Sequence, residues 1–174
     1  PSVESLLPRD ELPPRRENKL IAGKRRSATL PRTGLEGRMA RIEARYDLKL
    51  QLTLFSVSGS VTADELISAI ETNYGSNQTR NTIWDLTQCA LSGLDVDGLV
   101  RVSDCARQHS QGRKDPRTVF VVRSEQEAYL VKLYGEISAV RGSATQYDLV
   151  SSLDEAYAAL AVTDPFAGSA SSAG

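Results

Sequence analysis

Side chains that could carry out catalysis are few and scattered in this sequence. His109 is the only histidine, and Cys89 and Cys105 are the only cysteines. No nucleophile, base and orienting acid can be assembled around them, as acyl transfer or hydrolysis would need. Their spacing also does not match that of a zinc site, and the two thiols are expected to be small buried apolar groups. We therefore predict no catalytic centre, no metal site and no cofactor.

Asp85 is the carboxylate that could still act as a general acid or base. It follows Trp84 at the end of an apolar run, where an unpaired charge would be costly. Acid–base catalysis would need a second catalytic group, which the sequence does not offer. We expect a structural role instead, in which Asp85 accepts hydrogen bonds from the backbone of the 87–94 turn. A hydrolase that uses Asp85 is kept as the weakest alternative.

A pair of acids, Asp95 and Asp97, stands before an apolar helical pattern, with Ser92 and Gly98 beside it. Acids in a first helical turn commonly cap the helix and complement its dipole, which is the structural interpretation. The functional interpretation is that these four residues form a contact or regulatory surface. Ser92 is the nearest hydroxyl that a kinase could reach, although a serine beside a glycine is typical of a turn.

The charge of the chain does not indicate a nucleic-acid or membrane partner. The 21 basic and 22 acidic residues nearly cancel. Within residues 107–117, Arg107, Arg113, Lys114 and Arg117 could contact an acidic partner or a phosphate. No aromatic side chain is interleaved among them, so a solvated loop is the expected structure and no nucleic acid is predicted.

Five segments have the pattern of strands. Leu48, Leu50, Leu52 and Leu54 alternate, after which Phe55 and Val57 shift the phase, which indicates a strand with a bulge near its end. Two shorter apolar runs are typical of strands covered on both faces. Besides the leucine-rich strand, the predicted strands are Ala40 to Tyr46, joined to it by a tight turn at Asp47, Thr82 to Leu86, Thr118 to Val122, and Gln146 to Val150.

Capping signals mark the helix starts. Three pairs of a hydroxyl residue and a glutamate three positions later predict capping boxes, namely Thr62 with Glu65, Ser124 with Glu127, and Ser152 with Glu155. Asp95 is expected to cap the remaining helix, whose buried side would contain Val96, Leu99, Val100 and Ala106. The helix after Ser124 is expected to bury Leu130, Leu133, Tyr134, Ile137 and Val140.

The resulting order is β-β-α-β-α-β-α-β-α, which predicts an α/β fold. A single mixed, mostly parallel five-stranded sheet with four helices and one early hairpin accounts for it. The folded domain is expected over residues 39–162. Residues 1–38, with nine basic and five acidic residues and five prolines, are predicted to be a disordered basic tail, and residues 163–174 a second disordered tail.

The remaining features of the chain concern its start of translation and its cellular location. Met39 is the only methionine and directly precedes the first predicted strand, so translation starting there is one hypothesis and a genuine tail the other. No segment is apolar enough for a membrane span or a signal core. A cytoplasmic location is expected, since the two cysteines are too few for a disulfide framework.

The order of elements and three short motifs resemble the SpoIIAA-like proteins of the STAS family, named for sulphate transporters and anti-sigma-factor antagonists. The motifs are Gly59-Ser-Val-Thr-Ala-Asp-Glu-Leu66, Trp84-Asp85-Leu86 and Glu155-Ala-Tyr-Ala-Ala-Leu160. The resemblance covers about residues 40–161. It implies a small non-catalytic regulatory domain that binds a protein partner and is switched by phosphorylation of a serine at the start of the helix after the third strand.

The resembled switch motif, Asp-Ser-Ser-Gly-Leu, corresponds here to Asp95-Val96-Asp97-Gly98-Leu99, with two residues inserted in the preceding loop. Neither serine is present, and Asp97 stands where the phosphorylated serine would fall. A carboxylate carries less charge than a phosphate, so we expect a fixed charge without the usual switch. Some relatives are compared with the CRAL-TRIO lipid-binding fold. This implies an alternative function, binding of a small apolar ligand or lipid, with a pocket at Tyr129, Leu133 and Tyr134.

Overall fold

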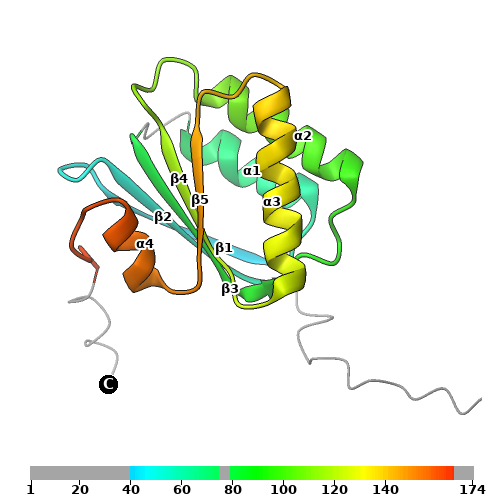
Figure 1. Ribbon diagram of the computed structural model, residues 1–174, viewed down its shortest axis with the longest axis horizontal. Helices are drawn as coiled ribbons and strands as arrows, with labels where there is room; N and C mark the ends of the chain where they lie inside the picture. The colour runs from blue at the N-terminus through cyan, green and yellow to red at the C-terminus, as the bar shows by residue number, and fades with distance from the viewer. Residues whose placement is uncertain (1–39, 75–78, 167–174) are drawn as a thin grey trace, which may run out of the picture. The chain divides into compact units, whose positions relative to one another are not determined.

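The computed structural model describes residues 40–74 and 79–166, which form one five-stranded sheet with four helices (Figure 1). The strands are β1 (Arg41–Asp47), β2 (Leu52–Ser60), β3 (Asn81–Ala90), β4 (Arg117–Val121) and β5 (Gln146–Val150). The helices are α1 (Ala63–Tyr74), α2 (Val96–His109), α3 (Glu125–Val140) and α4 (Leu153–Ala159).

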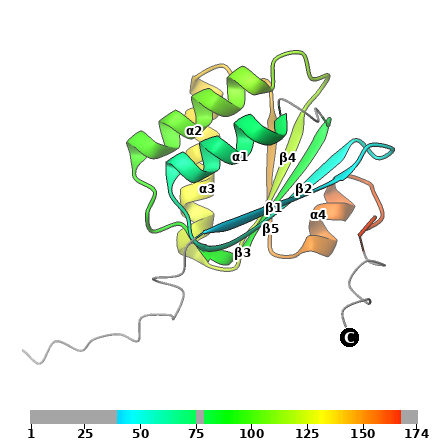
Figure 2. The same ribbon diagram turned by 180° about the vertical axis from the view of Figure 1, so that it is seen from behind.

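The sheet has the order β1-β2-β3-β4-β5, and only the pair β1 and β2 is antiparallel. Helices α1, α2 and α3 cover one face, and α4 lies against the other, as the two opposite views show (Figures 1 and 2). This architecture confirms the predicted fold class and the predicted order of elements. All four carboxyl ends of the parallel strands lie at one edge of the sheet, as parallel pairing requires.

Two apolar cores lie on either side of the sheet. The larger one, beneath α1, α2 and α3, contains Phe55, whose ring stacks on Trp84 at a centroid distance of 4.1 Å. The smaller core, beneath α4, contains Leu52, Ile83 and Tyr157. Since successive residues of a strand face opposite sides, Leu52 and Leu54 belong to the small core and Phe55 to the large one.

The four helices start where the capping signals predict. Ser124 and Glu127 form a complete capping box at α3, and Glu65 reaches back to the backbone N–H of Thr62 at 2.8 Å before α1. At α4 the pattern differs from the prediction, because the Glu155 carboxylate accepts from the N–H and hydroxyl of Ser151 instead of from Ser152. Ser152 itself still caps the helix by accepting from the Glu155 N–H.

The first hairpin is shorter than predicted. Residues 48–51 form its turn, so Leu48 and Leu50 do not belong to β2, although they continue its alternation. The Asp47 carboxylate accepts from the N–H groups of Lys49 and Leu50 at 2.9 and 3.0 Å, which closes the turn as an Asx motif. Gln51 completes the turn with a positive φ of 51°.

The buried stripes of two helices also differ from the prediction. In α3 the most buried residues are Val131, Tyr134 and Ser138, whereas Val140, expected to be buried, is 89% exposed. In α2, Val96 is 58% exposed, because it occupies the first helical position, ahead of the packed turns. Helix ends extend past the core, so periodicity alone overestimates their burial.

Helices α2 and α3 are joined by polar contacts as well as by apolar ones. The hydroxyls of Ser103 and Ser138, both fully buried, lie 2.9 Å apart. At the surface, Arg141 forms two hydrogen bonds with the Asp104 carboxylate, and this pairing lowers the pKa of Asp104. The two helices therefore pack as one unit.

The predicted ends of the chain fall mainly outside the described residues. The predicted tail over residues 1–38, the Met39 hypothesis and residues 167–174 lie there. Residues 163–166 are described, and Phe166 packs, partly buried, against the smaller core. Among residues 40–74 and 79–166, no helix is long and apolar enough to cross a membrane.

Candidate functional site

The loop between β3 and α2 and the first turn of α2 contain the residues predicted to form a contact surface. Ser92, Asp95 and Asp97 are exposed, and Leu94 between them is buried and anchors the loop to the core. The loop follows the carboxyl end of β3, the edge at which open α/β sheets commonly place their binding sites.

Asp95 caps α2, as predicted. Its carboxylate oxygen Oδ1 accepts from the Gly98 N–H at 2.7 Å, and its backbone is extended, as an N-cap requires. Capping by Asp95 is a structural role, which leaves its second carboxylate oxygen available for other contacts.

Gly98 is buried where α2 meets α1. A Cβ at this position would lie 3.0 Å from Asp95 Oδ1 and 3.1 Å from the Ala63 Cβ. These distances are shorter than ordinary contacts, so a glycine permits both the cap and the close approach of the two helices. Gly98 is therefore part of the packing beneath the loop and is not itself a surface residue.

Asp97, in contrast, makes no specific contact, and its structural effect is limited to complementing the dipole of α2 as an acid in the first turn. It is the second residue of α2 and is exposed, and it takes part in no hydrogen bond or ion pair within the described residues. Nearby, the first turn of α1 contributes Asp64, which pairs with Arg101 of α2. Exposed Val96 stands between the two acids, so the loop presents an apolar side chain flanked by negative charge.

Asp85 is not at the end of its strand, because β3 continues to Ala90, four residues beyond the predicted end at Leu86. Ser56 pairs with Asp85 and Ser58 with Gln88, so β3 contains one extra residue between these pairs, a β-bulge. The Asp85 carboxylate accepts from the N–H and the hydroxyl of Thr87 at 3.0 and 2.6 Å. Asp85 thus satisfies a backbone donor at the bulge, a structural use like the one predicted, but inside the strand.

This contact predicts the response of the fold to substitution of Asp85. Asp85→Ala should lower the free energy of unfolding by about 1 kcal/mol, because the Thr87 N–H loses its acceptor. Asp85→Asn should cost less than half as much, since an amide oxygen can accept the same bond. Guanidinium denaturation of both variants measures this, and equal losses would contradict the assignment. A hydrolase activity abolished by Asp85→Asn would revive the enzyme alternative.

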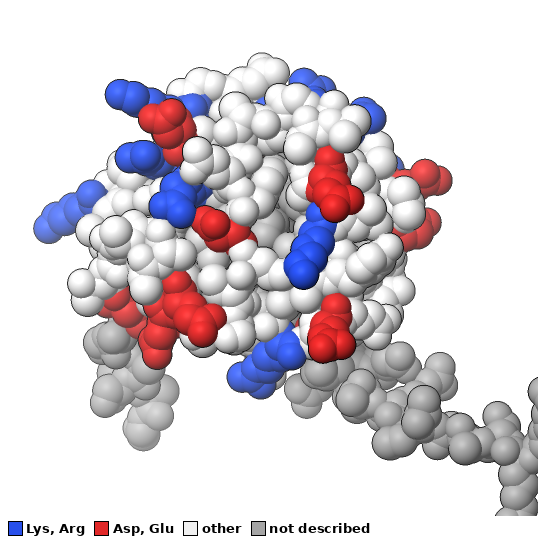
Figure 3. Space-filling model, viewed as in Figure 1, with Lys and Arg blue, Asp and Glu red and all other residues white. Residues whose placement is uncertain are grey.

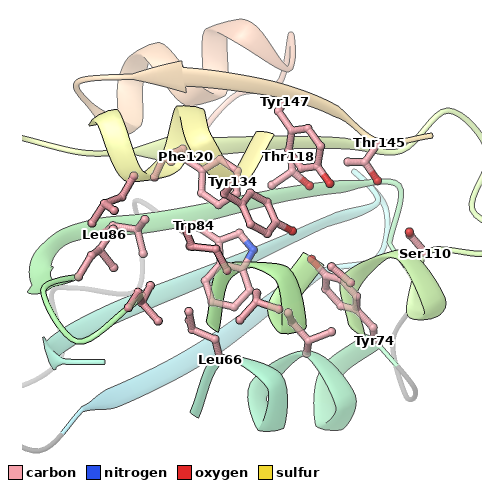
Figure 4. A pocket seen from close by; sticks show the side chains of 18 of the residues that line it. Leu66, Tyr74, Trp84, Leu86, Ser110, Thr118, Phe120, Tyr134, Thr145 and Tyr147 are labelled. Carbon is pink, nitrogen blue, oxygen red and sulfur yellow. The ribbon is translucent and has the colours of Figure 1, made fainter. Parts of the chain in front are cut away.

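The three residues of the predicted ligand pocket do not line one cavity. Tyr129 is 67% exposed, and Leu133 packs partly buried against the core away from the cavity wall. Tyr134 does line a cavity of about 60 Å³ between the helices and the sheet, together with Trp84 and Phe120 (Figure 4). The sequence could not reveal this cavity, because its walls come from seven different segments of the chain.

The cysteines and the histidine form no catalytic set. Cys105 Sγ lies 3.7 Å from His109 Nδ1, but His109 Nδ1 is also 3.0 Å from the Cys105 carbonyl oxygen, a contact within one helical turn. Burial raises the pKa of Cys105, and burial together with the Glu127 and Asp85 carboxylates raises the pKa of Cys89 to about 12. Both thiols are therefore held in the unreactive, protonated form. Within residues 40–74 and 79–166 no group of three or more His, Cys, Asp or Glu could hold a metal.

The comparisons with known proteins support the fold. No protein-family model and no curated protein sequence matches the chain. Among solved structures, an anti-sigma factor antagonist from Mycobacterium paratuberculosis matches with a TM-score of 0.51 and 17% identity, over 71% of this chain and 95% of that one. An antisigma-factor antagonist STAS domain from Rhodobacter sphaeroides matches at 6% identity over 67% and 90% of the chains, with a TM-score of 0.27, too low to support a common fold. The described part of the chain therefore has the STAS-like fold of anti-sigma factor antagonists, as the sequence motifs predict.

Proposed function

We propose that this chain is a non-catalytic protein-interaction module that contacts its partner through residues 92–98. The observation that carries the proposal is Asp97, an exposed carboxylate on the first turn of α2 without a partner among the described residues. Its neighbours Asp95 and Gly98 have structural roles that hold the turn in place. A rigid turn that presents an unpaired charge is suited to recognition.

The chemistry of this surface defines the partner that would fit it. Protein interfaces combine an apolar centre with a polar rim. Here exposed Val96 would be the apolar centre, and Asp95 and Asp97 the polar rim. The complementary surface would contain Lys or Arg side chains around a small apolar depression. The solved antagonist with the same fold is named for its action on anti-sigma factors, which makes anti-sigma factors the first class of partner to test.

The proposed module acts without a phosphoserine at its helix start. Position 97 is an aspartate, whose carboxylate is a permanent part of the chain, whereas a phosphate carries nearly two charges and can be removed. We infer that partner binding is regulated elsewhere or not at all through this turn. Ser92 is exposed and lies five residues earlier, so it is the hydroxyl to examine if phosphorylation is found.

Asp97→Lys tests the proposal directly. We expect it to weaken partner binding at least tenfold, because it replaces attraction with repulsion beside the apolar centre of the surface. The measurement is a two-hybrid screen of the source organism's anti-sigma factors, followed by titration calorimetry of the interacting pair with both variants.

Asp154→Lys is the matched control, since Asp154 is also an exposed acid in a first helical turn, but on α4 at the opposite face of the sheet. It should leave the affinity unchanged. Equal affinities for the wild type and Asp97→Lys would show that residues 92–98 are not the contact surface.

The alternative function, binding of a lipid, has weaker support. A cavity of about 60 Å³ is far below the volume of roughly 300–1,000 Å³ that small-molecule sites usually have. A lipid chain would have to separate α3 from the sheet.

The cytoplasm remains the proposed location, and it is compatible with two cysteines that are both free thiols.

A further inference from the structure

A second hollow in the surface lies far from residues 92–98, near the amino-terminal ends of the parallel strands. It is a cleft of about 440 Å³ lined by Gln51, Thr79, Arg80, Arg113, Lys114 and Asp115. Arg80 precedes β3, and Arg113 and Lys114 belong to the loop between α2 and β4. The volume of the cleft falls within the range usual for small-molecule sites.

The cleft has a surplus of positive charge, with three cations against one acid in its wall. Arg80, Arg113 and Lys114 take part in no ion pair among the described residues, and Asp115 is the one acid in the wall. Five other described arginines, in contrast, each pair with a carboxylate, namely Arg41, Arg101, Arg107, Arg117 and Arg141. Figure 3 shows several Lys and Arg side chains, with an acidic side chain among them, at the upper left of the molecule, where Figure 1 places the loop after α2.

Arg113 is the best placed of the three cations to bind an anion. Its Nη2 donates to the Arg80 carbonyl oxygen at 2.9 Å and to Thr82 Oγ1 at 3.2 Å, and its guanidinium lies 5.0 Å from the centre of the Tyr74 ring. These contacts hold the side chain in place. Its Nε is buried and has no hydrogen-bond partner in the part of the chain that the structure describes.

Two other arginines, Arg107 and Arg117, also have an Nε without a hydrogen-bond partner among the described residues, but their charge is paired. In both, the Nε atom is buried, and the side chain pairs with a carboxylate through Nη2. Within residues 40–74 and 79–166, the contacts of Arg113 are with neutral acceptors and an aromatic ring. A half-buried cation without a counter-ion is costly, so an anion that enters the cleft gains a preorganised charge-assisted contact.

Arg113 also lines the apolar cavity and so connects the two hollows. The cavity wall at this end includes Tyr74, Ser110 and Thr145, whose hydroxyls are drawn at the same end in Figure 4. Beyond them the wall is apolar, with Trp84 and Phe120. A ligand bound to Arg113 would therefore have cationic cleft on one side and aromatic cavity on the other.

From these observations we propose that the cleft binds a small organic anion, a carboxylate or a phosphate monoester with a short apolar group. The anionic group contacts Arg113, Arg80 and Lys114, and the apolar group reaches toward Tyr74 and the cavity. The cavity of about 60 Å³ restricts the apolar group to a few carbon atoms. This site is separate from the proposed partner surface, and either can exist without the other.

Titration calorimetry of the full chain with four probes tests the proposal. Hexyl phosphate and hexanoate supply the two anionic groups, inorganic phosphate lacks the apolar group, and hexylamine reverses the charge. We expect hexyl phosphate or hexanoate to bind with a Kd below about 1 mM, inorganic phosphate to bind at least tenfold more weakly, and hexylamine not to bind. Hexyl phosphate has an unbranched alkyl chain like that of hexanoate, so the comparison of these two affinities identifies the anionic group.

The fluorescence of Trp84, the only tryptophan, reports separately on the cavity. It should change with the binding isotherm of the organic anions and stay constant with inorganic phosphate. A failure of all anions to bind, or inorganic phosphate binding as tightly as hexyl phosphate, would overturn the proposal.

Variants locate the site. Arg113→Gln should weaken binding about tenfold or more, through loss of a charge-assisted contact, and Lys114→Gln severalfold. Arg123→Gln, at an exposed arginine outside both hollows, should bind as the wild type does. Because Arg113 also supports the fold through Arg80 and Thr82, far-UV circular dichroism checks its variant. If that variant does not fold, Lys114→Gln and Arg80→Gln decide, and unchanged affinity in both would place the anion elsewhere.

Discussion

Phe55→Ala is expected to lower the free energy of unfolding by about 3–5 kcal/mol, the largest effect of any substitution considered for this fold. Phe55 is 0% exposed, stacks on Trp84 at 4.1 Å and meets the Tyr74 ring at 6.0 Å. Removal of its ring leaves a void that β2 and β3 cannot close, because the sheet fixes their spacing. A loss of this size is a large part of the roughly 5–15 kcal/mol that a domain of this kind has in total.

Chemical denaturation followed by circular dichroism measures this loss. Tyr129→Ala is the matched control, since Tyr129 is also an aromatic residue but is 67% exposed, and its loss should stay within about 0.5 kcal/mol. A loss below 1 kcal/mol at Phe55 would mean that the aromatic cluster does not organise the larger core. A large loss at Tyr129 would show that the residue is buried in solution, against the structure.

Gly98→Ala is expected to destabilise the fold by about 2 kcal/mol, although alanine ordinarily favours a helix over glycine. The added Cβ would stand 3.0 Å from Asp95 Oδ1 and 3.1 Å from the Ala63 Cβ. It would therefore disturb the cap of α2 and push α1 away at the same time. The overpacking outweighs the gain in helix propensity.

Two further substitutions separate the effect of overpacking at Gly98 from the effect of helix propensity. Gly135→Ala in α3 should stabilise the fold by up to about 1 kcal/mol, because a Cβ there meets no atom within 4 Å and only the propensity effect remains. Ala63→Gly should recover part of the loss at Gly98, so the double variant should be more stable than the sum of the two single effects. Additive losses would place the clash at Asp95 alone.

The helix starts could be predicted from the sequence because capping is a local interaction. Thr62, Asp95, Ser124 and Ser152 each bind backbone donors within three residues, so their spacing alone contains the signal. The order of elements along the chain and the mostly parallel sheet followed from the alternation of these helices with apolar runs. The position of Asp95 at the cap and of Asp97 in the first turn of α2 could be predicted for the same reason.

The errors arose where a local pattern was overridden by a neighbouring segment. Leu48 and Leu50 continue the alternation of β2, but the segment forms a turn in which the Asp47 carboxylate accepts from the N–H groups of Lys49 and Leu50. Residues 87–90 look like a loop, yet they extend β3 because residues 58–60 of β2 pair with them beyond the bulge. Sequence alone does not show which partner a polar segment will find.

The two hollows were beyond prediction for a related reason. Arg113 lies in a polar run that resembles an ordinary solvated loop, and only the fold brings it beside Arg80 and Tyr74. Tyr129 and Tyr134 are five positions apart on α3, and that offset turns one outward and the other into the cavity. Whether a residue lines a cavity depends on how distant segments pack together, and the amino-acid composition does not reveal this.

Helix α2 has a consequence for how the two proposed sites relate. Its 14 residues span about 21 Å, beginning at the turn that contains Asp97 and ending shortly before the loop that contains Arg113. The buried Ser103 hydroxyl lies within hydrogen-bond distance of Ser138 on α3, so a shift of α2 alone would break this contact. A ligand at the carboxyl end of α2 and a protein at its amino end would both contact segments joined by this one helix. If either alters the affinity of the other, thermodynamic linkage requires the factor to be identical in both directions.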